Sequence, residues 1–279
     1  MLLAIDVGNT QTVIGLYGKD ENDSTGTGAE RDLMDHWRIA TSPERTSDEL
    51  ALLVQEFLGF HGFSFAAPKL DEGELAPAER QSITGVAMCS GVPRVTAELR
   101  QMTERYFGFP ALVLEPGVRT GMPILYDNPK EVGPDRIANA VGAYDLYGGP
   151  TIIVDFGTAT TIEAVSEAGE YLGGAIFPGV EIAMDALFGR AAGLRRVELQ
   201  PPKHVIGKST AESIQSGTIY GFSAQVDGLV DRFVAELGEC TVVSTGGLAD
   251  LISPHARTVQ HYEPWLTLYG LRIIFERNG

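Results

Sequence analysis

The chain contains 279 residues, of which 44% are hydrophobic and 21% are charged, and its formal net charge is −16. This length exceeds one typical domain, and the near-average apolar content is enough for two hydrophobic cores. The acidic balance argues against a nucleic-acid surface or an anionic membrane as partner, so we expect the partners to be small molecules.

The first half opens with a predicted β-hairpin that has a polar turn. An apolar run over residues 2–5 leads into Asp6-Val7-Gly8-Asn9-Thr10, and a return strand is expected over Thr12–Tyr17. A third strand is predicted at His36–Thr41. Two stretches rich in polar and turn-forming residues are predicted loops: Gly18–Asp35 and Ala66–Arg80.

An amphipathic helix follows the third strand. Thr46-Ser47-Asp48-Glu49 is a capping box, in which the side chains at both ends bond each other's backbone N–H groups. The apolar residues after it recur at helical spacing: Leu50, Leu53, Val54, Phe57 and Leu58. Three further elements are predicted in this half: a strand at Ile83–Cys89, a helix at Val95–Phe107 and a strand at Ala111–Leu114.

The second half repeats this order. Asp155-Phe156-Gly157-Thr158 follows another apolar run, with Asp155 lying 149 positions after Asp6. The other predicted elements are strands from Thr151, Thr161 and Tyr171, a helix from about Val180, a strand at Thr241–Ser244 and a terminal helix from about Trp265. The repetition predicts an α/β fold of two duplicated βββαβα domains, residues 1–148 and 149–279, with the C-terminal helix docking on the first.

Both hairpins suit phosphate binding. A glycine two residues after each aspartate removes the Cβ that would keep a phosphate from the backbone, so the N–H groups of the turn can point at its oxygens. The aspartates suit a hard cation, such as Mg²⁺ bridging the phosphates of ATP. The alternative is two ordinary hairpins with Asp and Gly as turn formers. The neutral donors expected in the two copies are Asn9, Thr10 and Thr12, and Thr158, Thr160 and Thr161.

A cytoplasmic location is expected. No signal pattern precedes the first predicted strand, and no apolar run approaches the roughly 18 residues that a membrane span needs. Cys89 and Cys240 stand far apart without a neighbouring Cys/His cluster, so neither a disulfide framework nor a zinc site is predicted.

The duplicated unit, with a late Thr245-Gly246-Gly247, resembles the actin, Hsp70 and sugar-kinase superfamily, whose domains are ribonuclease H-like. More narrowly, the chain resembles type III pantothenate kinases. The stretches that carry this likeness keep their order along nearly the whole chain: residues 115–121 (EPGVRTG), 126–129 (YDNP), 133–136 (GPDR), 173–176 (GGAI), 207–210 (GKST) and 263–268 (EPWLTL). Two positions depart from the usual family pattern, Pro134 in place of Ala and Gly91 in place of Thr.

The resemblance implies transfer of the γ-phosphoryl group of ATP to pantothenate, the first step of coenzyme A biosynthesis, by a homodimer. It implies Asp135 as the proton acceptor, Asp155 as the site of a monovalent cation (K⁺ or NH₄⁺), and Asp6 as a contact to Mg²⁺ through ATP. The ATP-binding residues it implies are Asp6, Val7, Gly8, Asn9, Thr10, Gln11, Thr12, Val13 and Thr158. The substrate-binding residues it implies are Tyr126, Gly133, Pro134, Asp135, Arg136 and Thr210.

The residues around Asp135 support an anion site independently. Pro134 after Gly133 predicts a helix start, and free N–H groups there, with Arg136, suit a carboxylate or a phosphate. The plainer alternative is an acidic residue that only stabilises the helix start. The helix also has more apolar surface than one stripe, which predicts packing against a second copy; these residues are Ala138, Val141, Ala143 and Tyr144.

Two other functions stay open at this point. A related kinase could phosphorylate a different small hydroxyl compound, because the fold alone does not choose the acceptor. A non-catalytic, nucleotide-binding regulator is the second alternative. Loss of Asp6, Asp135 or Asp155 would favour the regulator, and all three are present.

Overall fold

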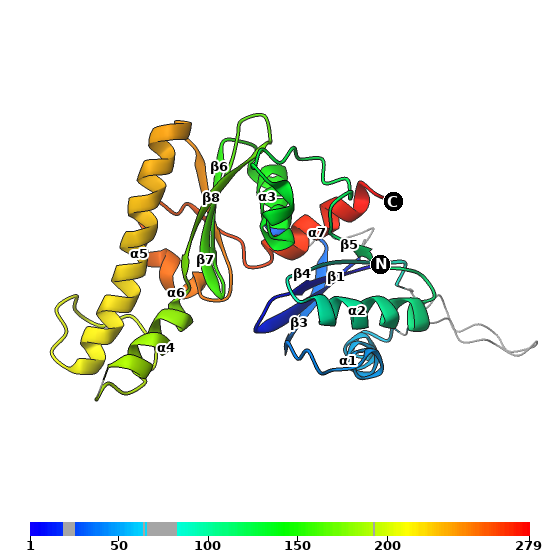
Figure 1. Cartoon of the computed structure of the whole chain (residues 1–279), viewed down its shortest axis with the longest axis horizontal. Coiled ribbons are helices and arrows are strands. Elements are labelled where there is room, and N and C mark those ends of the chain that lie inside the picture. The colour runs from blue at the N-terminus through cyan, green and yellow to red at the C-terminus, as the bar shows by residue number, and fades with distance from the viewer. Residues whose placement is uncertain (19–25, 64, 66–82, 192) are drawn as a thin grey trace, which may run out of the picture. The chain divides into compact units, whose positions relative to one another are not determined.

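The computed structural model describes residues 1–18, 26–63, 65, 83–191 and 193–279. The loop predicted at residues 66–80 lies outside these, as do residues 19–25 of the loop predicted at 18–35. By their contacts the residues form two compact units, each with its own sheet (Figure 1). The first comprises Met1–Thr120, Gly133–Ala138 and Thr267–Gly279, and the second comprises Gly121–Val132 and Asn139–Leu266. The division of the sequence between residues 148 and 149 stays a prediction about folding domains.

Each unit holds a mixed five-stranded sheet with the same topology. The first has the order β3-β2-β1-β4-β5, and the second β8-β7-β6-β9-β10. The first contains β1 (Leu2–Val7), β2 (Gln11–Tyr17), β3 (Leu33–Ala40), β4 (Gly85–Ser90) and β5 (Leu112–Val113). The second contains β6 (Thr151–Phe156), β7 (Ala159–Val165), β8 (Tyr171–Pro178), β9 (Thr241–Thr245) and β10 (His261–Tyr262).

The strand registers confirm the predicted duplication. Asp6 pairs with Val13 across the antiparallel β1–β2 ladder, and Asp155 pairs with Thr161 across β6–β7. Both second strands also shift register near their ends, at Leu16/Tyr17 and at Ala164/Val165. The two sheets therefore share their strand order and register, and in each an aspartate is the next-to-last residue of the central strand.

Seven α-helices are described: α1 (Ser47–Gly59), α2 (Pro93–Met102), α3 (Pro134–Tyr147), α4 (Val180–Arg190), α5 (Thr210–Leu237), α6 (Ala249–Ile252) and α7 (Leu266–Glu276). A π-helical turn, Thr103–Phe107, continues α2 to the predicted end. The capping box before α1 is confirmed, since Thr46 Oγ1 accepts the N–H of Glu49 and Glu49 Oε2 accepts the N–H of Thr46. Among the described residues, none of the helices is long and apolar enough to span a membrane.

Two helices, and not the single helix expected from the sequence, lie between the third and fourth strands of the second half. α4 is followed by α5, which has 28 residues and runs along one side of the second sheet (Figure 1). Its three glycines lower the intrinsic helix propensity and obscure the pattern. The buried Ile219, Phe222, Val226 and Val230 nevertheless lie at helical spacing, which was the available signal.

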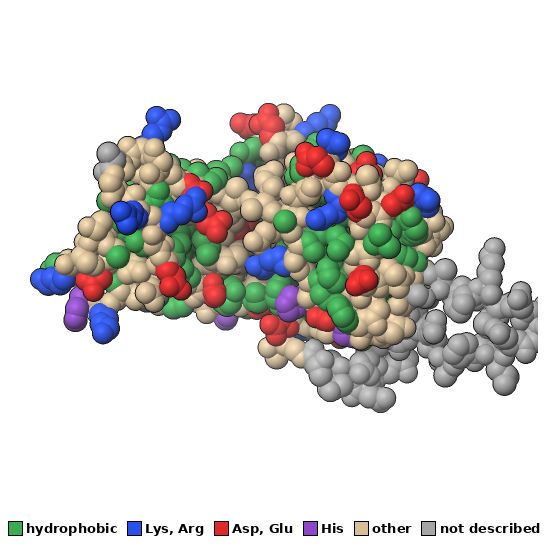
Figure 2. Space-filling view, turned by 90° about the horizontal axis from the view of Figure 1, so that it is seen from below, with side chains coloured by type: hydrophobic (Ala, Val, Ile, Leu, Met, Phe, Trp, Pro, Cys, Tyr) green, Lys and Arg blue, Asp and Glu red, His purple; other side chains and the backbone are tan. Residues whose placement is uncertain are grey.

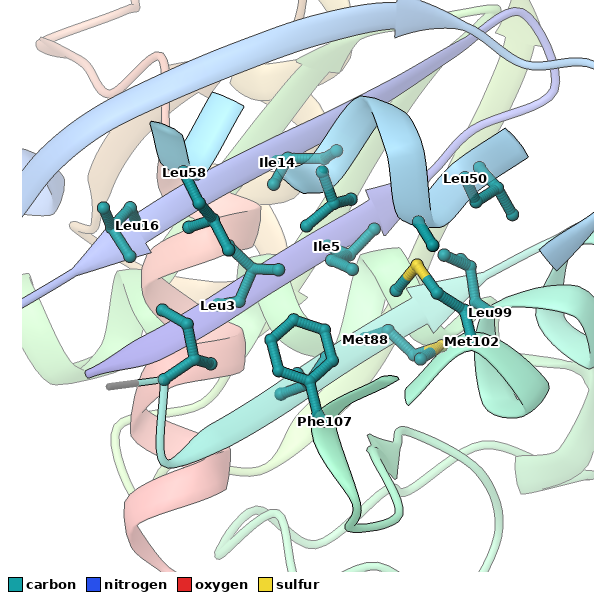
Figure 3. Packing of buried hydrophobic residues seen from close by; sticks show 14 of the residues in the cluster. Leu3, Ile5, Ile14, Leu16, Leu50, Leu58, Met88, Leu99, Met102 and Phe107 are labelled. Carbon is teal, nitrogen blue, oxygen red and sulfur yellow. The ribbon is translucent and has the colours of Figure 1, made fainter. Parts of the chain in front are cut away.

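The core of the first unit lies between the sheet and the helices α1 and α2. Figure 3 shows Leu3 and Ile5 of β1 beside Ile14 of β2, with Leu58 and Leu99 from the helices packed against them. In the second unit, alternate residues of β6 (Ile152, Val154, Phe156) join the core with α5. The intervening positions, including Asp155, lie on the opposite face of the sheet. That face is the one from which α3 contacts Asp155.

The C-terminal helix α7 is held in the first unit by Arg272. Its guanidinium pairs with Asp32 at 2.8 Å and donates to the carbonyl oxygen of Arg31 at 2.7 Å. The same group lies 5.6 Å from the centroid of the Tyr17 ring. Arg272 is only 14% exposed, so these contacts are partly shielded from water.

Replacing Arg272 with methionine should lower the free energy of unfolding by about 1–3 kcal/mol, because Asp32 and the Arg31 carbonyl lose a charged donor in a half-buried place. Urea unfolding followed by circular dichroism measures this. Arg257→Met is the matched control: Arg257 pairs with Asp231 at 2.8 Å on the exposed surface, where such a pair contributes about 0–1 kcal/mol. Equal losses for the two variants would contradict the assigned role of Arg272.

Candidate active site

The turn of the first hairpin is braced by a residue from a neighbouring strand. The N–H of Gly8 donates to the carbonyl oxygen of Gln11 at 3.0 Å and closes the turn. Thr41 follows β3 directly, and its hydroxyl group donates to the carbonyl oxygen of Gly8 at 2.7 Å. Its backbone N–H donates to the carbonyl oxygen of Thr10 at 3.0 Å. The sequence analysis missed Thr41, although its position at the end of the third strand was the available signal.

The predicted ATP-binding residues of this hairpin fall into two groups. Asn9, Thr10 and Gln11 are exposed. Thr12 is only 3% exposed, and its hydroxyl lies 2.9 Å from that of Thr41. The Thr41 hydroxyl proton is directed to the carbonyl oxygen of Gly8, so in the bond between the two hydroxyl groups Thr12 is the donor. The Thr12 hydroxyl group therefore has no proton left to donate to a phosphate. A contact from Thr12, or from the buried Val7, would come from the backbone.

Asp6 and Asp135 both act on one buried thiol. Cys89 of β4 stands beside Asp6 in the parallel register, and its S–H donates to Asp6 Oδ1 at 3.2 Å. Burial raises the pKa of Cys89 well above its usual value, and the negative charges of Asp6 and Asp135 raise it further. The structure therefore brings two predicted site residues into one neighbourhood. Cys89 itself was not predicted, because only strand pairing reveals its position.

The start of α3 forms as predicted. The helix begins at Pro134, and the N–H of Ile137 donates to the carbonyl oxygen of Gly133 at 3.2 Å. Asp135 is exposed, and its Oδ1 accepts the N–H of Arg136 at 2.9 Å. The side chain of Arg136 is almost fully buried. The N-terminus of α3 thus carries an exposed carboxylate, that of Asp135, and a nearly buried guanidinium, that of Arg136.

The apolar face of α3 does not support the predicted contact with a second copy. Ala138, Val141 and Ala143 are buried within the chain itself. Only Tyr144 of the four residues is partly exposed. The excess of apolar residues is explained by packing within the chain, because this helix is covered on more than one side.

The second hairpin is supported differently from the first. Its turn exposes Gly157 and Thr158, but Thr160 is 0% exposed, and its hydroxyl has no hydrogen-bond partner among the described residues. The position of Thr41 is taken here by Gly179, where a Cβ would overlap the carbonyl oxygens of Gly157 and Thr158. Backbone packing replaces the threonine brace, and the expected donor role of Thr160 is wrong because its side chain is buried.

Asp155 is partly buried and is approached by α3 and by the turn after β9. Its Oδ2 accepts a hydrogen bond from Asn139 Nδ2 of α3 at 3.0 Å. Its Oδ1 adjoins Gly246, where φ is +96° and a Cβ would overlap the carboxylate. Among the described residues, no group of three or more His, Cys, Asp or Glu could hold a metal ion. The assignment of a monovalent cation to Asp155 stays a prediction.

Two predicted acceptor residues lie on other elements of the second unit. Tyr126 packs over Gly173, and its ring centroid is 6.4 Å from that of Tyr171. Thr210 is the first residue of α5, whose N-cap Ser209 accepts the N–H of Glu212 at 3.2 Å. The assignment of Tyr126 and Thr210 to one acceptor site stays a prediction.

On the face shown in Figure 2, acidic and basic side chains are interspersed. Its basic side chains do not form a continuous stripe of the kind that follows a nucleic-acid backbone.

Thr41→Val should weaken ATP binding roughly 2–10-fold, because loss of one hydrogen bond of about 0.5–1.5 kcal/mol loosens the turn. Titration calorimetry with Mg·ATP measures the dissociation constant. Thr96→Val is the matched control, since its hydroxyl also donates to a backbone carbonyl, that of Val92 at 3.1 Å, but within α2. An unchanged dissociation constant in Thr41→Val would contradict the bracing role.

Comparison with known proteins identifies the family. The sequence model of the type III pantothenate kinase family matches residues 2–232. A type III pantothenate kinase from Streptomyces avermitilis is 52% identical over 283 residues, covering 100% of this chain and 98% of that protein. One from Frankia alni is 51% identical over 280 residues and is covered in full.

A conserved Baf family protein of known structure, from Campylobacter jejuni, is similar in fold. The match covers 99% of this chain and 98% of that one, with a TM-score of 0.55 and 17% identity. The two sheets of this chain share one strand order, as the duplicated βββαβα fold predicts. Since its family model spans most of the chain and its relatives are about half identical over the full length, the chain belongs to the type III pantothenate kinase family.

Proposed function

We propose that this protein transfers the γ-phosphoryl group of ATP to pantothenate, giving 4′-phosphopantothenate for coenzyme A biosynthesis. The observation that carries the proposal is the start of α3, where the exposed Asp135 carboxylate adjoins the nearly buried Arg136, in a chain that matches the type III pantothenate kinase family over residues 2–232. Family membership supports the choice of pantothenate over sugars or glycerol.

In this proposal each residue has a defined task. Asp135 orients the primary hydroxyl of pantothenate and accepts its proton as the oxygen bonds to the γ-phosphorus, while the bond from that phosphorus to the bridging oxygen of ADP breaks. Such a transition state is loose, so positioning matters more than strong basicity. Arg136 binds the pantothenate carboxylate. The remaining acceptor contacts come from Tyr126, Gly133, Pro134 and Thr210.

ATP is bound by the first hairpin, from Asp6 to Val13, and by Thr158. Mg²⁺ would neutralise charge on the phosphates, and Asp6 is the carboxylate of this hairpin that would hold it. Asp155 holds a monovalent cation, K⁺ or NH₄⁺. The family resemblance supports this last assignment, and the hydrogen bond from Asn139 holds the Asp155 carboxylate in place.

The remaining parts of the proposal concern the setting of the enzyme. We assign it to the cytoplasm, and the free Cys89 and Cys240 support a reducing compartment. We assign it no nucleic-acid or membrane partner, on the acidic balance of the sequence. We keep the homodimer as part of the proposal because the family resemblance implies it. We no longer propose that α3 forms the contact between the two copies.

Asp135→Asn should lower kcat by about 100-fold or more, because the amide keeps the shape but cannot accept the proton. ADP release, coupled to a recording enzyme and run with and without pantothenate, measures this. Asp145→Asn, an exposed position on the same helix, is the control and should keep normal kcat. Near-normal kcat in Asp135→Asn would reject the role, and equally efficient use of glucose or glycerol would reject the acceptor.

The proposed cation site predicts dependence on the salt used. At equal ionic strength, activity should be several times higher in potassium or ammonium chloride than in sodium chloride, because Na⁺ is smaller and more strongly hydrated. Asp155→Asn should remove the difference, since the charge that holds the cation is lost. Equal activity of the unchanged protein in all three salts would refute a selective cation site.

A further inference from the structure

The residues just before Tyr126 are bonded to the outermost strand of the second sheet, β8. The N–H of Tyr171, the first residue of β8, donates to the carbonyl oxygen of Pro123 at 2.9 Å. The N–H of Leu125 donates to the carbonyl oxygen of Tyr171 at 2.8 Å. The two bonds form a parallel bridge between Ile124 and Tyr171. The backbone that leads into Tyr126 is therefore held against β8.

The ring of Tyr126 lies on Gly173 and uses the space that a side chain there would fill. A Cβ at Gly173 would lie 3.3 Å from Cε2 and 3.4 Å from Cδ2 of the ring, so the ring would have to move by a few tenths of an ångström. The φ angle of Gly173 is +118°, a conformation that residues with a Cβ rarely adopt. Both the space and the backbone conformation therefore require glycine.

The first sheet shows that the fold alone does not require this glycine. The pairing of β8 with β7 skips Leu172, which makes a bulge between Tyr171 and Gly173. The pairing of β3 with β2 skips Met34 in the same way, and Asp35 stands where β8 has Gly173. Asp35 is not among the described non-glycine residues with a positive φ. The bulge thus forms with an ordinary residue in the first sheet, and the contact with Tyr126 supplies a separate reason for glycine in the second.

We propose that Gly173 is a positioning residue that seats the Tyr126 ring, and that this seat, with the bridge at Tyr171, fixes where the Tyr126 hydroxyl meets the acceptor. The inference rests on the proposed role of Tyr126 in binding pantothenate. A shift of a few tenths of an ångström matters there, because hydrogen bonds from hydroxyl groups are confined to about 2.5–3.0 Å. The seat also gives a task to the stretch at residues 173–176, which carries part of the family likeness.

The test is a double-mutant cycle between the two positions, read out as the KM for pantothenate. Gly173→Ala should raise this KM at least threefold, because the new methyl group displaces the ring. The dissociation constant for Mg·ATP, measured by calorimetry, should stay unchanged. In a Tyr126→Ala background the same substitution should raise the KM no further, since no ring is left to displace. A general structural effect of Gly173→Ala would instead raise the KM equally in both backgrounds.

Gly238→Ala is the matched control. Gly238 also has a positive φ, +85°, but nothing in the described part of the chain lies within 4 Å of the Cβ it would gain. This variant carries backbone strain without touching a ring, so its pantothenate KM should not change. If circular dichroism shows that Gly173→Ala does not fold, Leu125→Pro decides instead. It removes the N–H that donates to Tyr171, at an exposed residue, and should also raise the pantothenate KM at least threefold.

The outcomes separate this inference from the proposals beneath it. An unchanged KM in the folded Gly173→Ala variant, or in Leu125→Pro where that variant decides, would overturn the inference, as would an equal rise with and without the Tyr126 ring. An unchanged KM in Tyr126→Ala would overturn the assignment of Tyr126 to the acceptor site, and the inference with it. If the unchanged protein did not phosphorylate pantothenate, the proposed function itself would fail.

Discussion

A carboxylate at the end of a central strand needs hydrogen-bond donors, and the candidate site is built around that need. Asp6 and Asp155 occupy equivalent registers in the two sheets, between an antiparallel and a parallel neighbour. Burying either without a donor would be costly. Asp6 receives a bond from Cys89 and Asp155 receives one from Asn139. These bonds hold one oxygen of each carboxylate in place.

The two halves share a backbone but differ in the residues that support their turns. Thr41 braces the first turn by hydrogen bonds, whereas Gly179 supports the second by direct backbone contact. The Val13 and Gly15 positions of the first half become Thr161 and Glu163 in the second. The exposed polar side chains of the first hairpin therefore lie in its turn, at residues 9–11. The second hairpin has additional polar side chains, Thr161 and Glu163, on the face of the sheet that carries Asp155. This difference fits separate tasks for the two aspartates.

The fold on its own does not choose the reaction. A solved structure with the same overall fold and 17% identity supports the architecture alone. The choice of a kinase reaction depends on the family match and on the chemistry around α3, where an exposed carboxylate adjoins a nearly buried guanidinium. Asp135 is at the surface, as its proposed role requires, and Arg136 is nearly buried beside it.

The sequence by itself determined the duplicated architecture, because period-two and period-3.6 patterns are local and the Asp-x-Gly turns mark where the central strands end. It also located the start of α3, since Pro134 after a glycine is a local signal. It missed α5, whose glycines obscure the helical pattern. The partners of the two aspartates and of the first turn were out of its reach: Cys89, Asn139 and Thr41 lie 83, 16 and 33 positions from the groups they contact. Only strand pairing and helix packing bring such residues together, so tertiary structure alone decided which hydroxyls are donors, which are buried, and which carboxylate oxygens are already bonded.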